Sequence, residues 1–180
     1  MKYKHISLPL SIKDIASLRA GDAVLLSGEL YTARDAAHHR LFAMLESSVG
    51  RAICQKWPLP SPCAIYYAGP CPAAPGEIIG PCGPTTSARM DSYTPAIIEA
   101  GATALIGKGP RSPSVLSALR GRAVYFAVTG GAGMLIARSI TEVQMVAFPD
   151  LGTEAIRRFI IKDLPAIVAC DSVGGNLYAR

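Results

Sequence analysis

The apolar residues of this chain fall into short runs that follow two different spacings. Mostly continuous apolar runs of strand length occupy residues 22–30, 64–70, 102–109, 122–131 and 142–148. Helical spacing, or a proline near the start with a glycine stop, marks residues 32–48, 94–101, 112–121 and 132–140. Residues 154–178 read as two strand-like runs separated by Leu164-Pro165. Strands that alternate with helices predict a mixed α/β layered fold, and residues 1–180 fit a single domain.

Composition narrows the function classes. Half of the residues are hydrophobic, but 17 glycines and 14 prolines break them up, and no run approaches the ~20 residues of a membrane span. Residues 1–22 place Ser, Lys and Asp where a signal peptide needs an apolar stretch, so we expect a cytoplasmic protein that does not enter a membrane. The net charge of +5 is scattered, which argues against a nucleic-acid surface. A solvated face, or local cations for a small anion, fits this charge better.

The cysteines give no convincing metal site. There are five, with no C-x-x-C pair. Cys63, Cys71 and Cys82 share a Pro/Gly-rich segment, but their spacing matches no iron–sulfur ligand pattern. We expect reduced, partly buried thiols.

The segment from Gly83 to Arg89 gathers polar residues in an apolar context. Thr85 and the two residues after it favour a helix start, and a helix N-terminus attracts anions. Arg89 follows Thr85 by four residues, so both would lie at the first turn, where the guanidinium offers a fork to a carboxylate. The alternative is a helix-capping cluster beside a solvated charge.

Two further cations follow predicted strands. Lys108 comes after an apolar strand, between two glycines, and Arg34 comes after the strand at residues 22–30. The carboxyl ends of strands are where ligands collect in α/β domains. The alternatives are an ordinary turn lysine and an Arg34 that pairs with Asp35 or with the helix dipole. The sequence around Lys108 is not a phosphate-binding P-loop.

The neighbouring histidines, His38 and His39, lack a third partner at metal-ligand spacing. We interpret both as surface or packing residues. A role for His38 in supporting a site residue stays open.

Several of these motifs together resemble a known family. The chain is similar to the β subunit of two-subunit class I fumarases and L(+)-tartrate dehydratases, which corresponds to the C-terminal domain of single-chain class I fumarases. The resemblance covers nearly the whole chain in the same order, through "LYTARDAAHHRL", "YYAGP", "GPTTSARMDSYTP", "ALIGKG", "DLGTEAI" and "ACDSVGGNLY".

The resemblance implies a swivelling β/β/α domain and a hydro-lyase that adds or removes water across a dicarboxylic acid. It further implies a 4Fe-4S cluster whose cysteine ligands belong to an α subunit, in an α2β2 heterotetramer. No metal ligand and no cofactor is then expected in this chain.

Carried over by motif, Thr85 matches a threonine proposed as the catalytic base. Arg89 and Lys108 match catalytic and substrate-binding residues, and Arg34 matches a substrate-binding arginine. Positioning or proton relay is the alternative role for Thr85. Fumarate is the expected substrate. The alternatives are an L(+)-tartrate dehydratase β subunit, a non-catalytic module that binds small anions, and a structural partner that covers the cluster.

Overall fold

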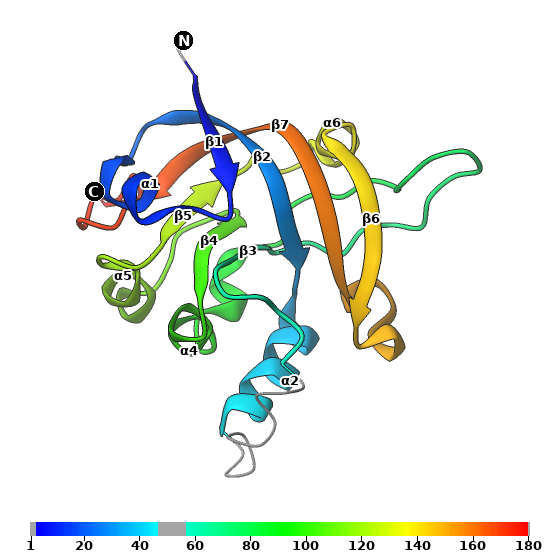
Figure 1. Ribbon diagram of the computed structural model, residues 1–180, viewed down its shortest axis with the longest axis horizontal. Helices are drawn as coiled ribbons and strands as arrows, with labels where there is room; N and C mark the ends of the chain where they lie inside the picture. Colours follow the sequence, from blue (N-terminus) through cyan, green and yellow to red (C-terminus); the bar gives the residue numbers. More distant parts are fainter. Residues whose placement is uncertain (1–2, 47–56, 180) are drawn as a thin grey trace.

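The computed structural model describes residues 3–46 and 57–179, and its strands form one mixed sheet (Figure 1). The strands are β1 (Lys4–Leu8), β2 (Ala23–Thr32), β3 (Cys63–Tyr66), β4 (Ala102–Gly107), β5 (Val124–Ala127), β6 (Ile140–Ala147) and β7 (Ile156–Cys170). Their order is β1-β2-β3-β4-β5-β7-β6, and β2 also pairs with β7. This extra pairing closes β2, β3, β4, β5 and β7 into a barrel-like ring.

Short helices connect the strands and follow their carboxyl ends. They are α1 (Ile12–Ser17), α2 (Asp35–Glu46), α4 (Thr94–Glu99), α5 (Pro113–Leu119) and α6 (Gly133–Ala137), with 3-10 turns η2 (Ser87–Met90) and η3 (Pro149–Glu154). Figure 1 shows α4 and α5 beside β4 and β5, and α2 beyond the end of β2. The mixed α/β class is thereby confirmed. The helix expected over 32–48 begins at Asp35, and residues 47–48 lie outside the described part of the chain.

Strands β3, β4 and β5 bury both of their faces, which explains why they read as unbroken apolar runs. Successive side chains of a strand point to opposite faces. On β4, Ile106 belongs to the cluster that also holds Leu26 of β2 and Phe159 of β7, whereas Leu105 packs in a second cluster with residues of α2, α4 and α5. On β5, Phe126 and Tyr125 divide in the same way. The strands thus separate an interior core from a helix-covered core.

The structure corrects the prediction at both ends of the chain. Residues 154–178 were expected to form two strands, but β7 runs without interruption through Leu164-Pro165. Its length comes from pairing with β2, β5 and β6, which a local pattern does not reveal. At the other end, β1 and α1 occupy a region where the sequence predicted no element. Ser11 and Asp14 form a capping box that begins α1.

Candidate functional site

The sequence-predicted residues lie at one edge of the sheet. Strands β2, β3, β4 and β5 run parallel to one another, so their carboxyl ends meet at this edge. Arg34 lies two residues beyond β2, and Lys108 directly follows β4. Thr85 joins them, because its backbone N–H donates to the carbonyl of Tyr67, the residue after β3 (2.6 Å). This edge is the usual ligand position in α/β domains.

The segment that carries Thr85 is not the predicted helix start. Residue Pro84 bridges to Ala68 and Thr86 bridges to Lys108, so the chain crosses the strand ends before the four-residue turn η2. Thr86 makes no side-chain cap. The Ser87 hydroxyl instead hydrogen-bonds to that of Tyr125 (2.9 Å). A four-residue turn therefore takes the place of the expected helix and Thr86 does not cap it, while anion binding at this segment stays a prediction.

Two of the predicted cations converge although they are distant in sequence. Arg89 Nε donates to Asp35 Oδ1 at 2.7 Å. The Nη2 atom of Arg34 lies 3.6 Å from Asp35 Oδ2 and 3.3 Å from Glu154 Oε1. Glu154 also accepts the backbone N–H of Ala36 (2.8 Å), at the first turn of α2. The Arg34–Asp35 pairing considered as an alternative is thus real, and it forms part of a larger cluster.

Lys108 reaches this edge through other contacts. Its carbonyl accepts the Ser87 N–H (2.9 Å), and its side chain is half-buried beside Gly130. A Cβ placed on Gly130 would lie 3.4 Å from Lys108 Cδ and 3.6 Å from Nζ. The Lys108 side chain therefore lies against the turn at Gly130, while its backbone places it on the same edge as the Arg34–Asp35–Arg89 cluster.

Within the described residues, three buried side-chain atoms have no hydrogen-bond partner, and all three lie at the junction of β2 and α2. They are Arg34 Nε, Asp35 Oδ2 and His38 Nε2. His38 Nδ1 lies 3.0 Å from the Arg34 carbonyl. A carbonyl only accepts, so Nδ1 carries the hydrogen and Nε2 a lone pair. Burial lowers the pKa of His38 to about 4. His38 is thus a neutral packing residue that supports the Arg34 backbone, while His39 is exposed.

A buried arginine that sequence analysis missed ties the two halves of the site together. Arg111 Nε donates to Asp91 Oδ1 (2.7 Å), and its guanidinium stacks over the rings of Tyr67 and Tyr125. Burial opposes the charge, but Tyr67 and Asp91 outweigh it and raise the pKa of Arg111. The contact links the turn that carries Arg89 to the loop after Lys108. Arg111 and Asp91 are 20 residues apart in the chain, so helical or strand spacing does not predict that they pair.

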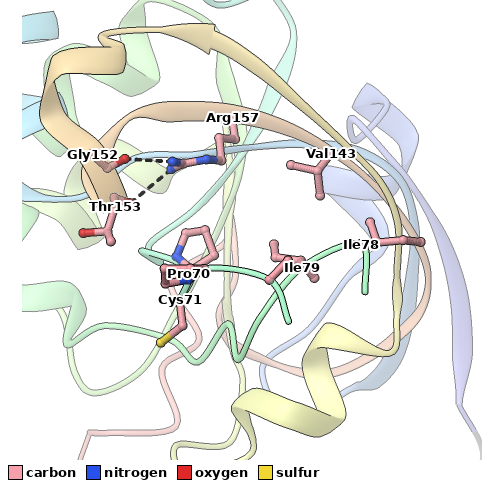
Figure 2. Close-up of a pocket in the computed structure, with 10 residues that line it drawn as sticks. Pro70, Cys71, Ile78, Ile79, Val143, Gly152, Thr153 and Arg157 are labelled. Carbon is pink, nitrogen blue, oxygen red and sulfur yellow. Dashed lines mark hydrogen bonds between the residues drawn. The ribbon is translucent and has the colours of Figure 1, made fainter. Parts of the chain in front are cut away.

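A hollow of about 410 Å³ adjoins this edge (Figure 2). Its walls are Pro70, Cys71, Pro72, Ala73, Ile78, Ile79, Val143, Gly152, Thr153 and Arg157. Figure 2 shows the Arg157 guanidinium turned to the carbonyls of Gly152 (2.8 Å) and Thr153 (3.3 Å). Because these carbonyls already hold the guanidinium, the hollow offers mainly apolar walls and is a weaker anion site than the Arg34–Arg89 cluster.

Among the described residues, no three thiols come together at one point. Cys82 lies in the interior core, whereas Cys63 and Cys170 lie in the helix-covered core. Burial raises the pKa of both Cys63 and Cys82 to about 12, which disfavours the thiolate that a metal requires. Cys71 is exposed, and Cys54 lies outside the described residues. These thiols do not fit an iron–sulfur cluster.

A search of the helices in residues 3–46 and 57–179 found none with the length and apolar character that crossing a membrane requires.

Comparison with known proteins places the chain in a family. Residues 2–180 match the family described as Fumarase C-terminus. The chain is 34% identical over 176 residues to fumarate hydratase 2 of Leishmania major, and the aligned region covers 93% of this chain and 29% of that protein. It is 33% identical over 158 residues to the anaerobic class I fumarate hydratase of Escherichia coli, covering 86% of this chain and 28% of that protein.

The chain also resembles a much shorter protein. It is 31% identical over 187 residues to the L(+)-tartrate dehydratase subunit beta of Escherichia coli, covering 98% of this chain and 87% of that subunit. The chain thus spans under a third of the fumarate hydratases named above but most of the tartrate dehydratase subunit. It belongs to the family of the class I fumarase C-terminus and the L(+)-tartrate dehydratase β subunit.

Proposed function

We propose that this chain is the β subunit of a class I hydro-lyase that interconverts fumarate and L-malate. The observation that carries the proposal is the convergence of Arg34 and Arg89 on Asp35, at the sheet edge that also holds Thr85 and Lys108. Relatives that bear the names of fumarate hydratases support the reaction.

In this proposal the cations bind and polarise the substrate carboxylates. Removal of a proton beside a carboxylate builds further negative charge on it, so donors placed before the reaction lower the barrier most. Arg34, Arg89 and Lys108 supply those donors. The planar guanidinium of an arginine can donate two parallel hydrogen bonds to a carboxylate, which the compact ammonium group of a lysine cannot do.

Thr85 takes the proton in this scheme. A threonine hydroxyl is too weakly acidic to act as a base unless nearby cations stabilise its alkoxide. In the dehydration direction, the Thr85 alkoxide takes the proton beside the carboxylate, the C–H electron pair forms the double bond, and the C–O bond breaks to release hydroxide. The hydroxide takes the proton back from Thr85 Oγ1 and leaves as water, which restores the alkoxide. The hydrogen bond from the Thr85 N–H to the Tyr67 carbonyl fixes the Thr85 backbone and does not involve the Thr85 hydroxyl.

The partner in the proposal is an α subunit that carries the 4Fe-4S cluster, in an α2β2 assembly. The separation of the described thiols between two cores supports a cluster held outside this chain. The free thiols support a cytoplasmic location. We further assign the ring and its outer helices to the swivelling β/β/α type, with the strands on either side of the interior core as the two β layers.

A specific observation favours a second candidate, L(+)-tartrate dehydratase. The chain covers 87% of the tartrate dehydratase β subunit of Escherichia coli, so the two are of similar length. Both substrates are four-carbon dicarboxylates, and the arginine cluster would bind the carboxylates that they share.

Anaerobic reconstitution with the cluster-bearing α subunit tests the proposal. The complex should be assayed on fumarate, L-malate and both tartrates, and its mass measured. We expect the highest kcat/KM for fumarate, and a folded, colourless and inactive chain in the absence of α. Turnover of L(+)-tartrate alone would select the second candidate. Failure of a cluster-loaded complex on all four substrates would overturn the proposal.

A further inference from the structure

Asp35 occupies a central position between the two arginines of the site. Its Oδ1 accepts from Arg89 Nε at 2.7 Å, and its Oδ2 lies 3.6 Å from Arg34 Nη2. We propose that Asp35 is a positioning residue that fixes the plane of the Arg89 guanidinium, so that its two terminal amino groups face a substrate carboxylate. This inference rests on the proposed function.

The way Arg89 is held carries the argument. A guanidinium has five N–H donors in a rigid planar fork. Asp35 takes the single donor on Nε, and no hydrogen bond of Nη1 or Nη2 is present within residues 3–46 and 57–179. The Arg89 side chain is 53% exposed, so its terminal edge is accessible. A bond at Nε therefore fixes the orientation of the group without occupying the edge that binds a carboxylate in two-pronged fashion.

The position of Asp35 is itself fixed. It is the first residue of α2, and Glu154 accepts the N–H of the next residue, Ala36, at 2.8 Å. Glu154 also contacts Arg34 at 3.3 Å. The side chain of Asp35 is 30% exposed, and its Oδ2 is buried without a hydrogen-bond partner. A carboxylate held at a helix start is a firm anchor for a long, otherwise exposed arginine.

Charge alone does not explain this arrangement. The two arginines are matched by two carboxylates, Asp35 and Glu154, so the cluster is close to neutral. A neutral cluster attracts a dianion weakly over distance. Its affinity must come from N–H donors aimed in the right direction, which makes the residue that aims them important for substrate binding.

Two variants of the reconstituted enzyme test the inference. Asp35→Ala removes the acceptor, and we expect KM for fumarate and L-malate to rise at least tenfold while kcat changes less than threefold. Asp35→Asn keeps a carbonyl oxygen of similar placement, and we expect it to restore most of the lost affinity. Equal KM values for the two variants, or a normal KM for Asp35→Ala, would overturn the positioning role. Asp35→Ser replaces Asp35→Ala in the comparison if the latter does not fold.

The matched control is Asp150→Ala. Asp150 likewise forms an ion pair that involves α2, since both of its oxygens accept from Arg40 of that helix at 2.9 and 2.8 Å, and it lies in η3 with Glu154. This pair is exposed. Removal of the Asp150 carboxylate should leave KM unchanged. This result would distinguish a changed orientation of the Arg89 guanidinium from a general destabilisation of α2. A rise in KM equal to that of Asp35→Ala would overturn the inference.

A second readout does not depend on activity. In the ¹⁵N-labelled chain, the Arg89 Nε–Hε signal, assigned by its loss in Arg89→Lys, should be protected from exchange with water. Asp35→Ala should abolish the protection and Asp35→Asn should retain part of it. An unprotected signal in the wild-type chain would overturn the inference. A protected signal in a chain that forms no active complex would show that the proposed function has failed while the Asp35–Arg89 contact stands.

Discussion

Acid should remove a stabilising contribution that comes from His38. The imidazole is buried at the junction of β2 and α2, and its Nδ1 bonds to the Arg34 carbonyl. Burial lowers its pKa to about 4, the Arg34 bond opposes this shift, and Arg111 adds to it. The unfolded chain binds a proton near pH 6.5, whereas the folded chain does not until about pH 4. Stability is therefore complete above pH 6.5 and falls as the pH drops toward 4.

The size of the effect follows from the two pKa values. With about 6.5 in the unfolded chain and about 4 in the folded chain, the loss between pH 7.5 and pH 4.5 is about 2.5 kcal/mol. That is a large share of the 5–15 kcal/mol typical of a domain's unfolding free energy. His38→Asn keeps a donor in place of Nδ1 but cannot titrate. It should cost about 1–3 kcal/mol through lost packing, at every pH.

Urea unfolding of the wild-type chain, His38→Asn and His39→Asn between pH 7.5 and 4.5 measures this effect. Other titrating groups cancel when variant and wild type are compared at the same pH. The stability advantage of the wild type over His38→Asn should shrink by about 2.5 kcal/mol on acidification. His39→Asn, at the exposed neighbouring position, serves as the matched control for the loss of a histidine from α2. Parallel curves for wild type and His38→Asn would refute the reasoning.

Three more predictions concern single residues of the site and the tail. Thr85→Ala should collapse kcat of the reconstituted enzyme with little change in substrate affinity, because the hydroxyl is needed when the proton moves; near-normal turnover would place the base elsewhere. Gly69→Ala should raise KM several-fold, because the new Cβ would lie 3.1 Å from Arg34 Cδ and Nη1; an unchanged KM would remove Arg34 from the site. Asp171→Asn should cost about 1–3 kcal/mol in urea unfolding and reduce the loss of stability in acid. Burial acts to raise the pKa of the Asp171 carboxyl, but backbone N–H donors led by Ala20 and Gly175 lower it below its usual range. An unchanged unfolding midpoint for Asp171→Asn would contradict this reading.

The sequence predicts most where the signal is local. Strands β4 and β5 are buried on both faces, and their unbroken apolar runs identify them directly. Because the carboxyl ends of parallel strands share one edge, the placement of Arg34 and Lys108 on that edge also follows from sequence. The Ser11–Asp14 capping box is a local signal for α1 that apolar spacing alone does not reveal.

The features that the sequence did not predict depend on contacts between residues far apart in the chain. The pairing of Arg89 with Asp35 spans 54 residues, and no spacing rule connects them. The Ser87 hydroxyl was predicted to cap a helix, but it bonds to Tyr125 instead. Gly107 leaves room for this contact, because a Cβ at position 107 would lie 2.1 Å from Ser87 Oγ. Local preference therefore yielded to packing against β4 and β5.

The kcat/KM of Arg89→Lys in the reconstituted complex tests the central claim most directly. Lysine keeps the charge but loses the bond from Nε to Asp35 and the two-pronged edge. We expect kcat/KM for fumarate to fall roughly ten- to a thousandfold, equivalent to about 1.4 to 4 kcal/mol, with normal α binding and cluster iron. Arg40→Lys, which alters an exposed pair with Asp150 on the helix that begins at Asp35, should leave kcat/KM unchanged. A normal kcat/KM for Arg89→Lys in a cluster-loaded complex would contradict the assignment of this sheet edge as the dicarboxylate site.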